Sequence, residues 1–128
     1  MAYFLDTSVA IHLRDRDPLI MDRVETLEGT VLLSIISRIE LEGGVYRFPH
    51  DSAVRRERLD LLLSVLPVVD FDMAAADAYG RIVERAGYSR RKILDRMIAA
   101  QALARNAALI TRNAADFQDI PGLSLIEW

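Results

Sequence analysis

Five short apolar runs, separated by segments of helical spacing, restrict the possible folds of this chain more than any other feature. Strands that alternate with helices are joined by right-handed crossovers and form a parallel sheet with helices on both faces. We therefore predict a single domain over residues 1–128, with a three-layer α/β/α fold around a central, mostly parallel sheet of five strands. The predicted strands are "YFL" at 3–5, "TVLLSIIS" at 30–37, "VVDF" at 68–71, "ALIT" at 108–111 and "LSLIEW" at 123–128.

The helices between these strands have recognisable ends. Asp17 is a predicted N-cap with Pro18 at the first helical position, and Gly29 lies just past the end of that helix. Gly87 closes a later helix in the same way. The first predicted helix runs through "VAIHLR", with Thr7 or Ser8 as its N-cap. The later predicted helices cover residues 18–28, 37–47, 51–66, 72–86 and 92–107.

Several classes of protein are excluded by what the chain lacks. It has no Cys, so it forms neither disulfides nor thiolate metal sites and has no cysteine nucleophile. No apolar run reaches the roughly eighteen residues of a transmembrane helix. The charge at Asp6 is also incompatible with a signal peptide. The sequence therefore favours a soluble, cytoplasmic protein without a membrane segment.

Charge is distributed unevenly along the chain. The net charge is −3, but the segment from Arg81 to Arg112 has eight basic and two acidic side chains and so carries +6. A basic zone of this kind can attract a polyanion even in an acidic protein, because the local potential steers the encounter. On charge alone, an Arg-rich helix face in contact with water is the better explanation.

Four carboxylates fall close to the predicted ends of strands. Asp6 directly follows the first strand, and no residue in the apolar run before it offers a partner. Glu40 lies one turn after the second strand, Asp95 in the first turn of the 92–107 helix, and Asp116 a short loop after the fourth strand. Ligand crevices in such sheets lie beyond the carboxyl ends of the strands. We therefore expect these side chains to gather at one edge of the sheet.

Three of these carboxylates also have a purely structural explanation. Glu40 follows Ser37 by three residues, which is the spacing of a capping box. Asp95 would complement the positive end of its helix, and Asp116 would be a turn residue after Asn113. For each residue taken alone, these explanations stay open.

Carboxylates gathered at one edge would repel each other, and a hard divalent cation would relieve that repulsion. Mg²⁺ prefers a few carboxylates plus water and needs neither Cys nor His. Thr7 and Ser8 add hydroxyls beside Asp6, and Thr111 and Asn113 add oxygens beside Asp116. Mg²⁺ or Mn²⁺ held in this way lowers the pKa of a bound water and stabilises charge on a phosphodiester. No zinc-site spacing, G-x-S-x-G elbow or Walker loop supports another chemistry.

The chain resembles the PIN-domain ribonucleases, and specifically the VapC-type toxins of bacterial type II toxin–antitoxin pairs. The resemblance covers essentially the whole chain and rests on "FLDTSV", "SRIELEGG", "LDRMIAAQAL" and "LITRNAADF", with "IPGLSLIEW" at the end. It implies a PIN fold and an endoribonuclease dependent on Mg²⁺ or Mn²⁺. The implied substrate is structured RNA, such as a tRNA or a ribosomal RNA loop, whose cleavage inhibits translation.

The resemblance also implies roles for individual residues. By motif position, Asp6, Glu40, Asp95 and Asp116 are similar to the first, second, third and fourth metal-binding, catalytic carboxylates of the family. The polar residues that support these ligands would be Thr7, Thr111 and Asn113. The expected RNA-binding residues are basic, with Arg96 expected either to contact phosphate or to neutralise the acidic site: Arg90, Arg91, Lys92, Arg96 and Arg112.

Two protein partners follow from the same resemblance. Such toxins form homodimers and are silenced by a VapB-type antitoxin, whose tail lies across the early helices. In this chain the groove for that tail is expected to be lined by apolar residues such as Val9, Ile11, Leu13, Leu19 and Ile20.

Three other functions find less support in the sequence than that of a toxin. A PIN nuclease of RNA processing would lack an antitoxin gene beside its own. A phosphoacceptor signalling module would use Asp6, but it normally needs paired acids at the first strand and a late Lys, and the only Lys here is Lys92. A catalytically inactive RNA-binding or antitoxin-binding module is opposed by the intact Asp6, Glu40 and Asp95.

Overall fold

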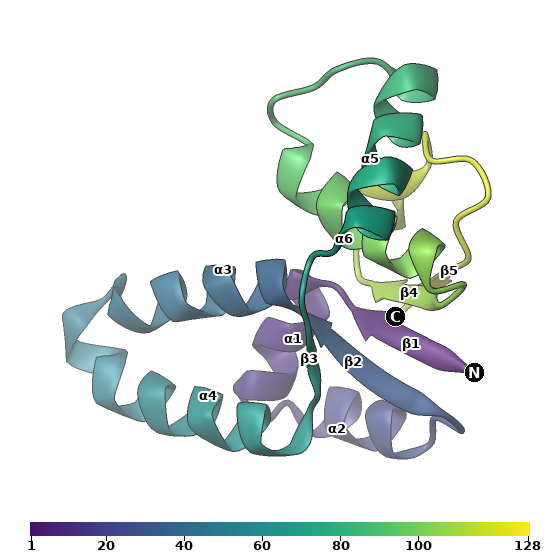
Figure 1. Ribbon diagram of the computed structural model, residues 1–128. Coiled ribbons are helices and arrows are strands. Elements are labelled where there is room, and N and C mark those ends of the chain that lie inside the picture. The colour runs from purple at the N-terminus through teal and green to yellow at the C-terminus, as the bar shows by residue number, and fades with distance from the viewer.

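The computed structural model describes all 128 residues and has a five-stranded sheet at its centre, in the order β3-β2-β1-β4-β5 (Figure 1). All neighbouring strands run parallel. The predicted α/β architecture is confirmed, and the sheet is fully rather than mostly parallel. The strands are β1 (Ala2–Leu5), β2 (Thr30–Ser34), β3 (Val68–Val69), β4 (Ala108–Thr111) and β5 (Leu125–Glu127).

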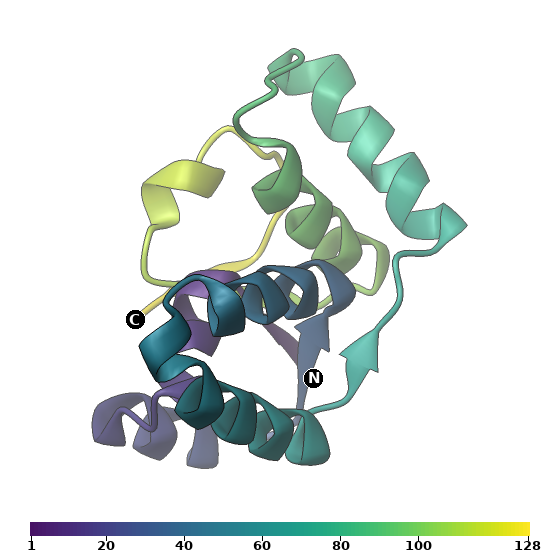
Figure 2. The ribbon, with the colours of Figure 1, turned by 90° about the vertical axis from the view of Figure 1, so that its left-hand side faces the viewer.

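Helices cover both faces of this sheet. α1 to α4 lie on one face and α5 and α6 on the other, and α5 packs on α6 rather than on the strands (Figure 2). Two short 3-10 helices complete the fold. The helices are α1 (Thr7–Arg14), α2 (Pro18–Glu25), α3 (Ile35–Tyr46), η1 (Pro49–Asp51), α4 (Ser52–Val65), α5 (Met73–Ala86), α6 (Ile93–Ala104) and η2 (Ala114–Phe117).

The strands divide their side chains between two apolar cores. Tyr3 and Leu5 of β1 point toward α1 to α4, whereas Phe4 between them points toward α5 and α6. Leu33 and Leu32 of β2 alternate in the same way. Successive side chains of a strand point to opposite faces, so a strand buried on both sides becomes a continuous apolar run. This is why these runs identified the strands.

Two predicted helix starts are wrong. β2 ends at Ser34, and α3 begins at Ile35 rather than at Ser37. The Ser34 hydroxyl accepts a hydrogen bond from the Ile36 backbone N–H at 3.0 Å and so caps α3. At α1, Asp6 is the N-cap in place of Thr7 or Ser8. In both cases the helix is capped by a polar residue at the carboxyl end of the preceding strand.

No helix in the structure combines the length and the apolar character that crossing a membrane would require.

Candidate active site

Asp6 stands at the carboxyl end of β1, and only 4% of it is exposed. Thr111, at the end of the neighbouring strand β4, donates its hydroxyl to Asp6 Oδ2 at 2.6 Å. The Ser8 hydroxyl donates to Oδ1 at 2.5 Å, and the Val9 backbone N–H donates to the same oxygen at 3.1 Å. Three donors therefore hold the carboxylate in one orientation, and a buried carboxylate needs such partners.

Glu40 lies in the second turn of α3 and is half-buried. The Thr7 hydroxyl donates to its Oε1 at 2.7 Å, and the same Thr7 oxygen lies 2.9 Å from the buried Ser37 hydroxyl. Glu40 thus does not bond back to the start of its own helix, and the capping-box explanation is wrong. Thr7 is adjacent to Asp6 in the chain, so this hydroxyl links the surroundings of Asp6 to Glu40.

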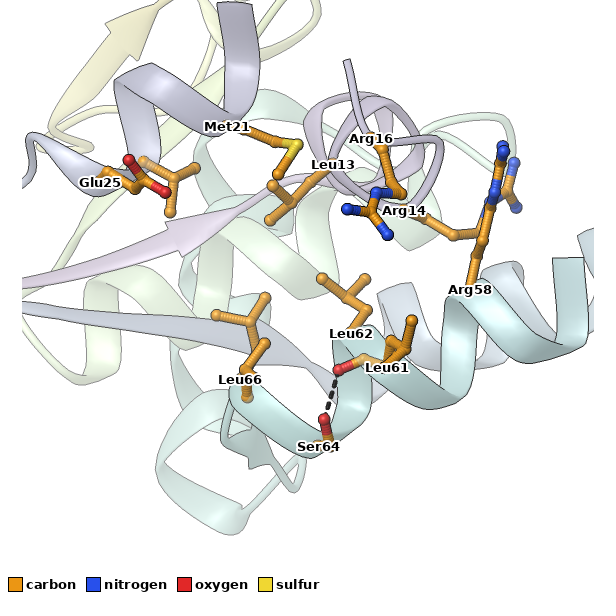
Figure 3. Close-up of a pocket in the computed structure, with 12 residues that line it drawn as sticks. Leu13, Arg14, Arg16, Met21, Glu25, Arg58, Leu61, Leu62, Ser64 and Leu66 are labelled. Atoms are coloured by element: carbon orange, nitrogen blue, oxygen red, sulfur yellow. Dashed lines mark hydrogen bonds between the residues drawn. The ribbon is translucent and has the colours of Figure 1, made fainter. Parts of the chain in front are cut away.

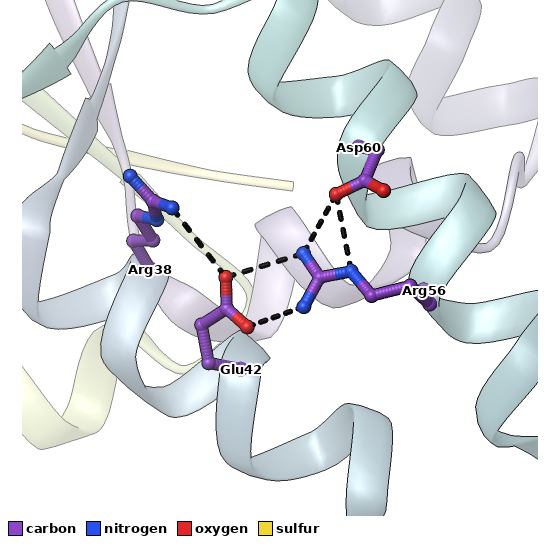
Figure 4. A network of polar contacts seen from close by, with 4 residues as sticks. All are labelled: Arg38, Glu42, Arg56 and Asp60. Atoms are coloured by element: carbon purple, nitrogen blue, oxygen red, sulfur yellow. Dashed lines mark hydrogen bonds and ion pairs between the residues drawn. The ribbon is translucent and has the colours of Figure 1, made fainter.

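The outer side of α3 is fixed to α4 by a network of charged residues (Figure 4). Arg56 of α4 donates to Glu42 of α3 at 2.5 and 3.2 Å and to Asp60 at 2.7 Å. Arg38 approaches Glu42 to 3.6 Å. The hydrogen bond from Arg56 lowers the pKa of Glu42. Because Glu42 is two residues from Glu40, the network helps to hold the helix that carries the candidate ligand.

Asp95 is a candidate ligand whose ionisation is strongly affected by its surroundings. It lies in the first turn of α6 and is half-buried. Burial, the larger cause, and repulsion from Asp116, Asp6 and Glu40 together raise its pKa to about 6. The charge of Lys92 opposes this rise. Asp116, Asp6 and Glu40 therefore lie near enough to Asp95 to repel its carboxylate.

A cation would relieve this repulsion, and the structure limits how it would be bound. No three acidic side chains, in the positions they occupy, converge closely enough to chelate a bare ion. Mg²⁺ usually keeps several of its waters and binds through one or two carboxylates. An oxygen-only set of donors with excess negative charge fits such a hydrated hard cation.

The polar residues expected beside these carboxylates contribute unequally. Thr7 and Thr111 donate directly to carboxylates, whereas Asn113 contributes only its backbone N–H, which donates to the Thr111 hydroxyl at 3.0 Å. Ser8 and Ser37 belong to the same set: Ser8 was expected as a possible helix cap or as a hydroxyl beside Asp6, and Ser37 only at a helix start. Their proximity in the chain to Asp6 and Glu40 was the available signal. Asp116, in η2, is exposed at the rim.

Arg96 is not available to RNA. Only 2% of it is exposed, and its guanidinium donates to the Gly87 carbonyl at 2.5 Å and to Asp119 at 3.1 Å. The expected phosphate contact is therefore wrong, and the carboxylate that Arg96 neutralises is Asp119, outside the predicted acidic set. Lys92 donates to Asp119 as well, at 3.0 Å. This bond, with a smaller effect of Arg96, lowers the pKa of Asp119.

The remaining basic candidates are Arg90, Arg91 and Arg112, and all three are exposed. None of them takes part in an ion pair. Arg90 and Arg91 lie just before α6, the helix that carries Asp95 near its start. Arg112 directly follows Thr111, the residue that donates to Asp6. Unpaired cations therefore lie next to the acidic residues along the chain.

A parallel α/β sheet with carboxylates at one edge is the arrangement expected of the PIN domain, and comparison with known proteins supports this class. The family model of the PIN domain matches residues 3–123, and the chain belongs to this family. Within the family it is of the VapC type. It is 30% identical to Ribonuclease VapC2 of Rickettsia felis, over 100% of this chain and 98% of that protein. It is 25% identical to the tRNA(fMet)-specific endonuclease VapC of Shigella flexneri, with the same coverage.

A solved structure shows the same fold. The VapBC2 complex of Rickettsia felis, bound to a DNA fragment from its promoter, contains a chain that matches this one with a TM-score of 0.88 and 30% identity. The match covers 100% of this chain and 99% of the other. The resemblance found in the sequence is thus confirmed at the level of family and fold.

Proposed function

We propose that this protein is the toxin of a toxin–antitoxin pair, a metal-dependent endoribonuclease formed by a single PIN domain that hydrolyses a phosphodiester of structured RNA. The observation that carries the proposal is the state of Asp95, which is half-buried and repelled by three other carboxylates, with Lys92 opposing them. Such a surplus of negative charge is unfavourable for a folded protein and suits one that binds a cation.

Asp6, Glu40 and Asp95 would hold the ion, with Asp116 at the exposed rim. Bound Mg²⁺ or Mn²⁺ supplies a water of lowered pKa and stabilises negative charge on the phosphodiester. The chain's own contribution is orientation. Thr111 and Ser8 fix the oxygens of Asp6, and Thr7 fixes Glu40.

Cleavage of total cellular RNA by the purified, antitoxin-free protein tests this function. We expect cleavage with Mg²⁺ or Mn²⁺, none with EDTA, and recovery when the metal is restored. A tRNA or a ribosomal RNA loop is the proposed target class, because sequence-specific proteins usually recognise unpaired loops. The naming of the Shigella relative as a tRNA(fMet)-specific endonuclease supports tRNA.

Arg90 and Arg91 are proposed to contact the RNA backbone. Replacing both by Gln is expected to weaken RNA binding and to reduce the slope of log affinity against log salt by about 1 to 2, since each phosphate contact releases counterions. The control is the double change of Arg81 and Arg105 to Gln, which alters net charge equally at two other exposed positions. RNA affinity measured from 50 to 300 mM salt gives this slope. An unchanged slope would show that Arg90 and Arg91 do not contact the RNA backbone.

The antitoxin is proposed to bind an apolar groove of about 300 Å³ between α1, α2 and α4 (Figure 3). Leu61 and Val65 of α4 line it and are 53% and 73% exposed, which is unusual for neighbouring apolar residues without a partner. Arg14, Arg16 and Arg58 also line it and outnumber its one acidic residue, Glu25, so an antitoxin segment with an acidic residue among apolar ones would complement it.

The groove differs from the expected one. Val9 and Ile20 are fully buried in the core, and Ile11 and Leu19 are exposed but lie outside the groove. Of the five residues expected to line it, only Leu13 does so. Helical spacing marks an apolar face but does not tell which part of it the sheet covers.

Val65→Asp is expected to weaken antitoxin binding about 100-fold, because it places an unpaired carboxylate in an apolar contact. RNA cleavage by the free protein should not change. Val54→Asp, at an exposed position on the same helix but outside the groove, is the matched control. Calorimetry with the antitoxin provides the measurement, and equal affinities of the two variants would place the antitoxin elsewhere.

We also expect the free toxin to be a homodimer, which light scattering on the purified protein measures directly.

A further inference from the structure

Gln101 is a polar side chain in the most apolar part of α6, and only 2% of it is exposed. Its amide nitrogen donates to the carbonyls of Val69 and Asp70, both at 3.1 Å. Its amide oxygen accepts the hydroxyl of Ser34. Both N–H groups and the carbonyl are therefore used, as a buried amide requires.

These three bonds join separate parts of the fold. Val69 ends the edge strand β3, and Ser34 ends β2 and also caps α3 through its bond from the Ile36 N–H. Gln101 itself belongs to α6. One side chain thus connects α6 to the start of α3 and to the end of the two-residue strand β3.

This connection lies about the same distance along α3 from Glu40 as it lies along α6 from Asp95. Glu40 is six residues beyond Ser34 on α3, and Asp95 is six residues before Gln101 on α6, which corresponds to about 9 Å along each helix axis. A tilt of only about 5° between the helices at this point would move each carboxylate by roughly 0.8 Å, since displacement grows with distance along the helix. Binding sites of this kind must be held to within about 0.5 Å.

We infer that Gln101 is a positioning residue that sets the placement of α6 against α3, and thereby the spacing of Asp95 and Glu40. The inference rests on the proposed metal site. Amide hydrogen bonds are directional, so they define an angle between helices that apolar contacts of the same volume leave less defined.

Gln101→Met tests this role, because Met keeps the length of the side chain and loses all three hydrogen bonds. We expect the dissociation constant for Mn²⁺, measured by water-proton relaxation, to rise about tenfold. We expect kcat to fall while KM for RNA stays unchanged. Ile82→Val is the control, since it weakens the same core without touching the amide contacts.

A second readout needs no metal. The chain has no Cys, so spin labels at Gly43→Cys on α3 and Ala104→Cys on α6, both exposed, would be the only thiol labels. The distance distribution between them should be narrow in the parent and in Ile82→Val and broader in Gln101→Met. Ser34→Ala removes one of the same bonds from the other side and should broaden it too.

The possible outcomes distinguish a failure of the positioning role of Gln101 from a failure of the proposed metal site. If the parent binds Mn²⁺ and Gln101→Met binds it equally well with an equally narrow distribution, the positioning role is wrong and the metal site stands. If the parent binds no Mn²⁺, the proposed metal-dependent function fails, and the spin-label distances alone decide the placement of α6. If Ile82→Val weakens Mn²⁺ binding as much as Gln101→Met, the effect is general loss of stability and the positioning role is overturned.

Discussion

Asp6→Asn is expected to reduce RNA cleavage by about 10³-fold while the protein stays folded. The change removes one negative charge from the place where the metal ion would be held, and electrostatic groups at such positions contribute on this scale. The fold should survive because Asn is as good an N-cap as Asp. Its amide oxygen can take the place of Oδ1, which accepts from Ser8 and from the Val9 N–H.

Asp17→Asn is the matched control for this variant. Asp17 caps α2 by accepting from the backbone N–H groups of Leu19 and Ile20, so the substitution removes the same charge at the same kind of position. It should leave cleavage unchanged. Circular dichroism checks the fold of both variants, and cleavage of total RNA with Mg²⁺ measures activity. An Asp6→Asn protein that cuts RNA as fast as the parent would show that Asp6 is only a helix cap.

Asp95→Asn is expected to abolish cleavage and yet to stabilise the metal-free protein at neutral pH. The pKa of Asp95 is about 6 in the folded protein against 3.8 for the free carboxyl. Between these values the folded state binds more protons than the unfolded state, so stability falls as pH rises through this range. The destabilisation of the folded state by ionised Asp95 is fully present above about pH 6 and absent below about pH 4. Allowing for partial exposure, it is about 2 kcal/mol.

Urea unfolding in EDTA at pH 4 and pH 7.5 measures this effect. Parent and Asp95→Asn should have similar free energies of unfolding at pH 4, and the variant should be more stable at pH 7.5. Mn²⁺ should stabilise the parent more than the variant, because a ligand of the folded state adds stability in proportion to its affinity. A variant that is less stable than the parent at pH 7.5 would show that Asp95 is not repelled as described.

The fold was largely predictable because strands buried on both faces are recognisable as apolar runs. The error at the start of α3 has a physical cause. Ile35 and Ile36 continue the apolar run of β2, so the pattern hides the point at which the Ser34 hydroxyl ends the strand and caps the helix. Local spacing also suggested a capping box at Ser37, whereas that hydroxyl meets Thr7, thirty residues earlier in the chain.

The candidate site was predictable to the extent that its residues follow strand ends or begin helices. Asp6 and Asp95 occupy such places, and their mutual repulsion emerges in the folded structure. Arg96 was misjudged because an arginine beside an acidic residue resembles a surface cation. Its burial depends on Gly87 and Asp119, contacts that the sequence near Arg96 does not reveal. The sequence near Gln101 does not reveal its contacts either, since its partners Val69 and Asp70 lie more than thirty residues away.

We propose that Asp6, Glu40 and Asp95 hold one hydrated divalent cation. Anomalous scattering from crystals soaked in Mn²⁺ tests it most directly, since the ion is located without reference to activity. We expect a single strong peak bounded by these three carboxylates. Crystals that are saturated with Mn²⁺ and show density only at other surface carboxylates would contradict the claim.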